Sequence, residues 1–231
     1  MDKPISEVIR DRIVESGDRY WAGDNISKHI KEGEKELLID ELAAIYESSL
    51  KALLIDTTND PNSKGTGRRM AKMQINEILS GRYNEAPDAT AFPNDNEQTR
   101  YDGMLVAQAS INSICSHHFA QVFGTAYIGI IPGNKVIGLS KYTRIAQWCA
   151  RRGTLQEELC NDITREIQAA SGSDDVGVYL KLRHNCCETR GVMSSDSTTQ
   201  TTVLRGAFRT DVGTKAEFFD NIRIQEMSKR K

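Results

Sequence analysis

Two short segments hold most of the residues in this chain that could bind a metal. They are SICSHHF at 113–119 and HNCCETRG at 184–191. Between them they contain three of the four histidines and three of the five cysteines of the chain. Thiolate and imidazole are ligands that zinc prefers in proteins. Each segment follows a strand-like run, so the sequence predicts a metal site where two strands end.

The spacing of these residues favours a catalytic metal site. Cys115 and His118 form a C-x-x-H pair that can bind one ion from a single turn, and Cys186 or Cys187 would supply a third ligand. Three protein ligands leave a fourth position open for water, whereas a structural zinc usually takes four protein ligands. The alternative is that the cysteines are small buried apolar residues and the histidines are ordinary core or surface groups.

Two further groups of residues could bind an anionic nucleotide. Ser140, Lys141 and Arg144 lie in the first turn of a predicted helix, where backbone N–H groups and cations favour phosphate. Gln156 and Glu157 open the next predicted helix, and a carboxylate there could accept two parallel hydrogen bonds from a guanine. The ordinary alternatives are a solvated charged face and a carboxylate that only stabilises the helix N-terminus.

Four more polar residues flank these groups. His117 and His184 are left over from the metal site and would be placed for proton transfer, because imidazole titrates near neutral pH. Arg190 lies near the end of the second metal-binding segment, after its cysteines, and Arg69 lies at the start of another predicted helix. Both arginines could add positive charge to a phosphate site.

The composition indicates a protein of the cytoplasm. Its 231 residues carry a net charge of −2, so no whole-chain field attracts nucleic acid or a membrane. Five cysteines, two of them adjacent, do not resemble a secreted disulfide framework. The N-terminus lacks the apolar core of a signal peptide, and no stretch approaches the length of a membrane span. We therefore expect reduced thiols and neither a nucleic-acid nor a membrane partner.

The pattern of apolar residues predicts three regions. Residues 1–83 form a helical N-terminal region, with helices over 34–56 and 68–80. Residues 84–100 form a polar loop, for which a disordered insertion is the alternative. Residues 101–231 follow the order strand, strand, helix, helix, strand, strand, and end in a helix over 215–227. Helices grouped between two hairpin-like strand pairs predict an α+β fold with an antiparallel sheet.

The sequence resembles the GTP cyclohydrolase I family. The matching segments, in the family's order, are GTGRRMAKM with EILSG, SICSHHF, VIGLSKYTRI, ARRGTLQEEL, HNCCETRGV, STTQTTVLRGAF and AEFFDNIR. The resemblance runs from about Arg68 to the C-terminus, apart from the polar loop. It implies the tunnelling fold (T-fold), in which a four-stranded antiparallel sheet with two helices joins those of other subunits in an oligomeric barrel. It also implies a homodecamer of two pentamers, with active sites between subunits.

The resemblance also implies a role for each site residue. The zinc ligands would be Cys115, His118 and Cys186, whereas Cys187 falls at a position that the family does not use. The proton-transfer residues would be His117 and His184. The triphosphate contacts match Ser140, Lys141, Arg144 and Arg190, with Arg69 reaching in from a neighbouring subunit. The guanine anchor matches Gln156 and Glu157.

The activity implied is zinc-dependent conversion of GTP and water into 7,8-dihydroneopterin triphosphate and formate. The dihydroneopterin triphosphate can feed folate, biopterin or 7-deazaguanine synthesis. Two departures bear on turnover and substrate choice: Ser116 replaces the family's glutamate, and Gly67 replaces a proline. The alternatives are a paralogue that prefers another purine nucleotide such as dGTP, an NADPH-dependent deazaguanine reductase, and a non-catalytic, zinc-stabilised oligomer that binds nucleotides.

Overall fold

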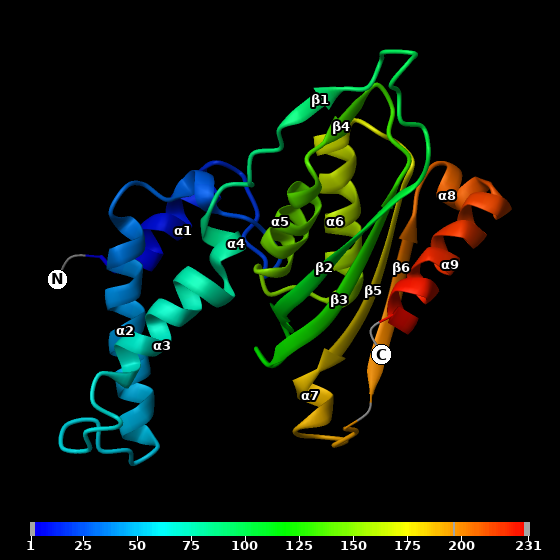
Figure 1. Cartoon of the computed structure of the whole chain (residues 1–231). Coiled ribbons are helices and arrows are strands. Elements are labelled where there is room, and N and C mark those ends of the chain that lie inside the picture. Colours follow the sequence, from blue (N-terminus) through cyan, green and yellow to red (C-terminus); the bar gives the residue numbers. More distant parts are fainter. Residues whose placement is uncertain (1–2, 196, 229–231) are drawn as a thin grey trace. The chain divides into compact units, whose positions relative to one another are not determined.

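The computed structural model describes residues 3–195 and 197–228 and divides the chain into two units (Figure 1). Unit 1 comprises residues 1–85 together with 151–153, and unit 2 comprises 86–150 and 154–231. The return of 151–153 to unit 1 was not expected from the sequence.

Unit 1 is helical in its described part. Its elements are α1 (Ile5–Glu15), the 3₁₀ turn η1 (Ser27–His29), α2 (Glu34–Ala52), α3 (Thr66–Met73), the π-helical turn η2 (Gln74–Ile78) and α4 (Ser80–Tyr83). Helix α2 begins where the sequence predicts but ends four residues early. The chain turns there at Leu54, which has a φ of 61°. The helix predicted over 68–80 is divided by η2 and ends in a separate short helix.

Unit 2 is built on a four-stranded sheet in the order β2-β3-β5-β6. Its strands are β2 (Leu105–Ile114), β3 (Gln121–Ile130), β5 (Val176–His184) and β6 (Thr198–Leu204), and every neighbouring pair is antiparallel. A separate antiparallel pair joins β1 (Ala91–Pro93) to β4 (Lys135–Ile137). The prediction of an α+β fold with an antiparallel sheet is therefore confirmed. The stretch predicted as a loop contains β1, a strand too short to show alternation.

Helices cover both faces of this sheet. On one face lie α5 (Leu139–Ala150) and α6 (Gln156–Ser171), and on the other lie α8 (Ala207–Thr210) and α9 (Val212–Ser228) (Figure 1). The four-residue helix α7 (Asn185–Glu188) directly follows β5.

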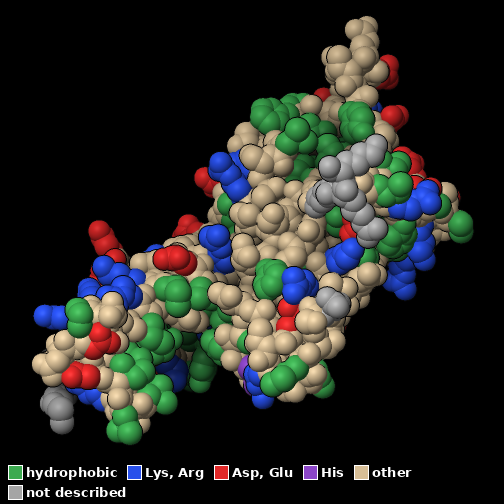
Figure 2. Space-filling model, turned by 60° about the horizontal axis from the view of Figure 1, so that its bottom comes forward, with side chains coloured by type: hydrophobic (Ala, Val, Ile, Leu, Met, Phe, Trp, Pro, Cys, Tyr) green, Lys and Arg blue, Asp and Glu red, His purple; other side chains and the backbone are tan. Residues whose placement is uncertain are grey.

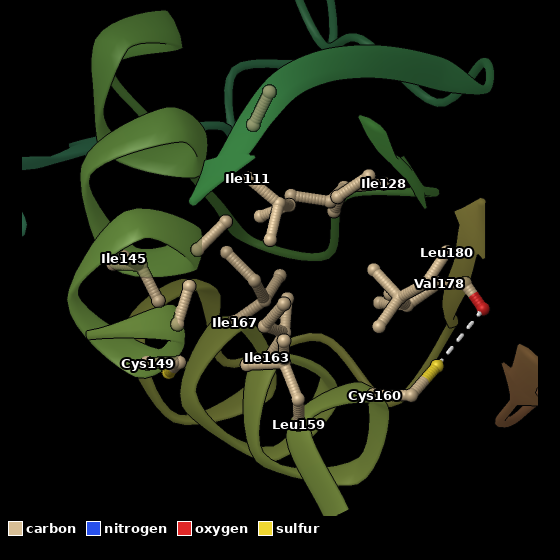
Figure 3. Close-up of a cluster of buried hydrophobic side chains, with 14 of the residues drawn as sticks. Ile111, Ile128, Ile145, Cys149, Leu159, Cys160, Ile163, Ile167, Val178 and Leu180 are labelled. Atoms are coloured by element: carbon tan, nitrogen blue, oxygen red, sulfur yellow. Dashed lines mark hydrogen bonds between the residues drawn. The ribbon is translucent and has the colours of Figure 1, made fainter. Parts of the chain in front are cut away.

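The main core fills the layer between the sheet and helices α5 and α6. Leu159, Ile163 and Ile167 recur every four residues along α6 and are 0–1% exposed, because this spacing keeps them on one side of the helix. Figure 3 shows them facing Val178 and Leu180 of β5. Burying such side chains stabilises the fold by roughly 1.5–3 kcal/mol each. Because β5 packs against this layer, the core fixes the position of the strand end that carries part of the candidate site.

The described surface has a mixed charge. Figure 2 shows Lys and Arg side chains interspersed with Asp and Glu on the face in view. No helix within 3–195 or 197–228 is long and apolar enough to cross a membrane.

Candidate metal centre and nucleotide site

Strand register brings the two metal-binding segments together. Strands β2 and β3 form a hairpin in which Ile114 is opposite Gln121, so Cys115 begins the connecting turn. The Cys115 N–H donates to the Ala120 carbonyl at 3.0 Å, which extends the ladder into the turn. Val122, at the start of β3, pairs with His184, the last residue of β5. The first segment therefore lies beside the strand end from which the second departs.

Three side chains from these segments converge. The candidate ligand atoms of Cys115, His184 and Cys186 all lie within 4.8 Å of one another. Cys115 is 6% exposed, and the other two are partly buried. Two thiols and an imidazole at this separation are a donor set that suits zinc. The arrangement fits the metal predicted from the sequence.

The two histidines of the first segment point away from this group. His118 is exposed, and its Nε2 is 3.0 Å from Nη1 of Arg190. His117 is also exposed, and its ring meets that of His118 edge-on, with centroids 6.5 Å apart. The structure thus places His184, which was expected in proton transfer, next to the two thiols, and places the expected ligand His118 next to Arg190. The assignment of the third ligand stays a prediction.

The two adjacent cysteines differ in their surroundings. The Sγ atoms of Cys186 and Cys187 are 3.9 Å apart, but only Cys186 belongs to the convergent group. Burial, followed by the neighbouring thiols Cys187 and Cys115, raises the pKa of Cys186 to about 11. This thiol is therefore protonated without a metal, and metal binding would displace its proton.

Gln156 holds His184 from the helix side. Its Nε2 donates to the Thr199 carbonyl at 3.0 Å and to Thr201 Oγ1 at 2.8 Å, and its Oε1 lies 2.7 Å from His184 Nε2. Burial lowers the pKa of His184, and the carboxylates of Glu157 and Glu188 oppose that shift. The imidazole is thus oriented by an amide and favoured in its neutral form.

The carboxylates at the start of α6 have different contacts. Glu157 is exposed. Glu158 instead accepts a hydrogen bond from Thr154 Oγ1 at 2.6 Å, which ties it to the residues that precede the helix. Both carboxylates are exposed, but no intramolecular side-chain hydrogen bond to the Glu157 carboxylate is seen in the described residues, so Glu157 is the freer of the two to bind a ligand.

The predicted phosphate contacts lie on two units. At the start of α5, Ser140 and Arg144 are exposed, and Lys141 Nζ donates to the Asp88 carbonyl. Arg69 belongs to unit 1, where its guanidinium donates to Lys64 O at 2.9 Å and to Thr66 Oγ1 at 2.6 Å. The role of these residues in phosphate binding stays a prediction.

Sequence reasoning missed the residues that support the site. Thr199 and Thr201 lie two apart on β6 and so share the face that meets Gln156, a relationship that strand alternation could have suggested. Arg183 and Glu188 form an ion pair across the second segment, and no local pattern in the sequence marks it.

Known proteins match this chain over most of its length. A sequence profile for the family described as GTP cyclohydrolase I matches residues 45–223. GTP cyclohydrolase 1 of Aeromonas salmonicida (strain A449) is 40% identical over 192 residues, which cover 82% of this chain and 84% of that relative. GTP cyclohydrolase 1 of Flavobacterium johnsoniae is 34% identical over 221 residues, covering 93% and 96%. A crystal structure of the archaeosine synthase QueF-Like, in the apo form, matches 45% of this chain and 93% of that chain, with 16% identity and a TM-score of 0.36, too distant a likeness to support an argument.

Proposed function

Because the chain belongs to the GTP cyclohydrolase I family, we propose that it is a zinc-dependent enzyme that converts GTP and water into 7,8-dihydroneopterin triphosphate and formate. The observation that carries this proposal is the convergence of the Cys115 and Cys186 thiols, beside the imidazole of His184, at neighbouring strand ends. This donor set suits a metal that activates water.

The metal would be held by Cys115, Cys186 and the imidazole of His118. His118 lies in the same turn as Cys115. A change of its side-chain rotamer would turn its imidazole away from Arg190 and toward the thiol of Cys115. Zinc, when bound, supplies a Lewis acid that makes water reactive near neutral pH.

His184 and His117 would move protons during the reaction. Gln156 accepts from Nε2–H of His184, so Nδ1 of the neutral ring carries the lone pair that can take up a proton. His117 is exposed beside the same turn and can exchange protons with solvent. Purine ring opening, release of formate and closure of the pterin ring each require such transfers.

The substrate would be held at its two ends. Glu157, exposed at the start of α6, would accept hydrogen bonds from the guanine, with Gln156 beside it. The triphosphate would meet Ser140, Lys141, Arg144 and Arg190, and Arg69 of a neighbouring subunit. Guanidinium groups suit this role because they bind phosphate oxygens in pairs.

We further propose a T-fold assembly for residues 101–231, preceded by the helical region 1–83 and by the connecting segment 84–100, which contains β1. Strands β2 and β6 are the edges of the described sheet, and edge strands present unpaired backbone groups that can pair with another subunit. The proposed assembly is a homodecamer of two pentamers. The proposed setting is the cytoplasm, where the product would serve tetrahydrofolate, biopterin or 7-deazaguanine synthesis.

The test is to incubate the purified, zinc-loaded protein with GTP and, separately, with dGTP, and to follow formate and pterin absorbance. Formate and pterin from GTP are expected. This result would show that the reaction tolerates Ser116 in place of the family's glutamate. Turnover of dGTP alone would favour the paralogue with altered substrate. Nucleotide binding without formate would indicate the non-catalytic oligomer, and NADPH consumption with a deazaguanine would indicate the reductase.

A further inference from the structure

An ion pair clamps the segment that carries Cys186. Nε of Arg183 lies 2.8 Å from Oε1 of Glu188, and Nη2 lies 2.7 Å from Oε2, so the guanidinium and the carboxylate meet as two parallel forks. The Glu188 side chain is 6% exposed. Exposed ion pairs contribute little, but a bidentate pair with a buried carboxylate fixes geometry as well as charge.

The two members of the pair flank the metal-binding residues. Arg183 is the last residue of β5 before His184, and Glu188 ends α7, two residues after Cys186. Helix α7 has four residues, far fewer than the roughly 12 needed for a helix to be stable alone in water. The position of Cys186 therefore depends on contacts between this short helix and the rest of unit 2.

Arg183 is itself anchored to the sheet and to the next loop. Its guanidinium lies 5.2 Å from the centre of the Phe123 ring on β3, and Nη2 donates to the Ser195 carbonyl at 3.3 Å. Because side chains alternate along a strand, Arg183 and His184 point to opposite faces of the sheet. Gln156 thus holds His184 from one face, while Arg183 holds α7 from the other.

We propose that Arg183 and Glu188 are positioning residues that hold Cys186 in place for the metal, an inference that rests on the proposed zinc-dependent function. Neither residue binds the ion. Together they fix the short helix that presents the thiol, as outer contacts do at other metal sites, where their loss lowers metal affinity by about 10–100-fold.

The experiment measures zinc affinity in the full chain by competition with a chromophoric chelator. Glu188→Gln keeps the shape of the side chain but removes its charge, and we expect about 10-fold weaker zinc binding. Arg183→Lys keeps the charge but cannot form the fork, so a smaller loss is expected. The double variant should lose no more than the worse single variant, because both changes break one interaction.

The matched control is the Lys181–Glu226 pair. It starts from the same face of β5, two residues earlier, with Nζ 2.9 Å from Oε1, and it does not hold α7. Glu226→Gln should leave zinc affinity unchanged, and the thermal midpoints of the zinc-free variants show whether each is folded. If folded Glu188→Gln binds zinc with wild-type affinity, the positioning role of Arg183 and Glu188 is wrong, whereas the proposed zinc dependence is unaffected. A wild-type chain that binds no zinc would overturn both the clamp and the proposed zinc dependence.

Discussion

His184 Nε2 lies 2.7 Å from Gln156 Oε1, and this contact sets which ring nitrogen of His184 carries the hydrogen. The Thr199 carbonyl can only accept, so the Gln156 nitrogen must face Thr199 and its oxygen must face the imidazole. Nε2 of His184 therefore donates, and the lone pair of the neutral ring is on Nδ1. These three contacts use both amide hydrogens of Gln156, so a lone pair of its oxygen is what remains for the guanine.

Gln156→Met should lower kcat more than it raises KM. The methionine side chain has a similar length but cannot hold the imidazole, and we expect kcat to fall by about 10- to 100-fold with KM changed less than about threefold. Steady-state kinetics of pterin formation, at zinc content matched to the wild type, measure both. A raised KM with an unchanged kcat would instead support the role of Gln156 as a guanine anchor.

Glu157→Gln should weaken GTP binding without loss of zinc. The amide replaces one of two accepting oxygens by a donor, so the guanine loses a charged hydrogen bond, and KM should rise by about 10-fold or more. Glu158→Gln is the matched control, because Glu158 is also exposed but already accepts a hydrogen bond from Thr154. Equal KM values for the two variants would argue against Glu157 as the anchor.

The sequence predicted the antiparallel sheet because alternation and turn residues are local signals. It also predicted that Cys115 would meet Cys186 or Cys187, because both segments follow predicted strands, and the family resemblance implied Cys186, the one that the structure places beside Cys115. It could not predict that His184 rather than His118 would face the thiols, because side-chain direction within a turn depends on neighbours such as Arg190. Contacts between distant elements leave no local pattern either.

Gly124→Ala should destabilise the sheet next to the site. Gly124 has a φ of 159°, and a Cβ there would lie 2.2 Å from the Lys181 carbonyl oxygen and 2.9 Å from Leu182 Cα, so β3 and β5 would have to separate. We expect a loss of about 1–3 kcal/mol in the free energy of unfolding. At Gly133 a Cβ meets nothing within 4 Å, so Gly133→Ala is the control. Thermal unfolding compares them, and equal midpoints would refute the close approach.

Glu34→Gln should make unit 1 less stable near neutral pH but not in strong acid. Arg12 binds both oxygens of Glu34 at 2.8 Å, and this hydrogen bonding lowers the pKa of Glu34 from 4.5 to about 2. Because the folded pKa is depressed, the stabilisation is complete above pH 4.5 and is lost as the pH falls to about 2.

The expected difference between Glu34→Gln and the wild type at pH 7 is roughly 1–3 kcal/mol. Urea unfolding followed by the fluorescence of Trp21, in a Trp148→Phe background, measures it at several pH values. Glu36→Gln, in the same first turn but exposed, is the control for charge at the helix start. A difference that persists unchanged at pH 2 would show that the ion pair is not its source.

The ligand set can be settled with four single variants and cobalt in place of zinc. Cys186→Ser should abolish tight metal binding, whereas Cys187→Ser should retain it, because only Cys186 belongs to the convergent group. His118→Ala should lose the tetrahedral cobalt spectrum, and His184→Ala should keep that spectrum while turnover falls by about 100-fold or more. The opposite result for the two histidines would make His184 the ligand and leave His118 beside Arg190, as the structure places it. The thiolate-to-cobalt absorption reports the cysteines separately, so a lost ligand can be told from a misplaced proton donor.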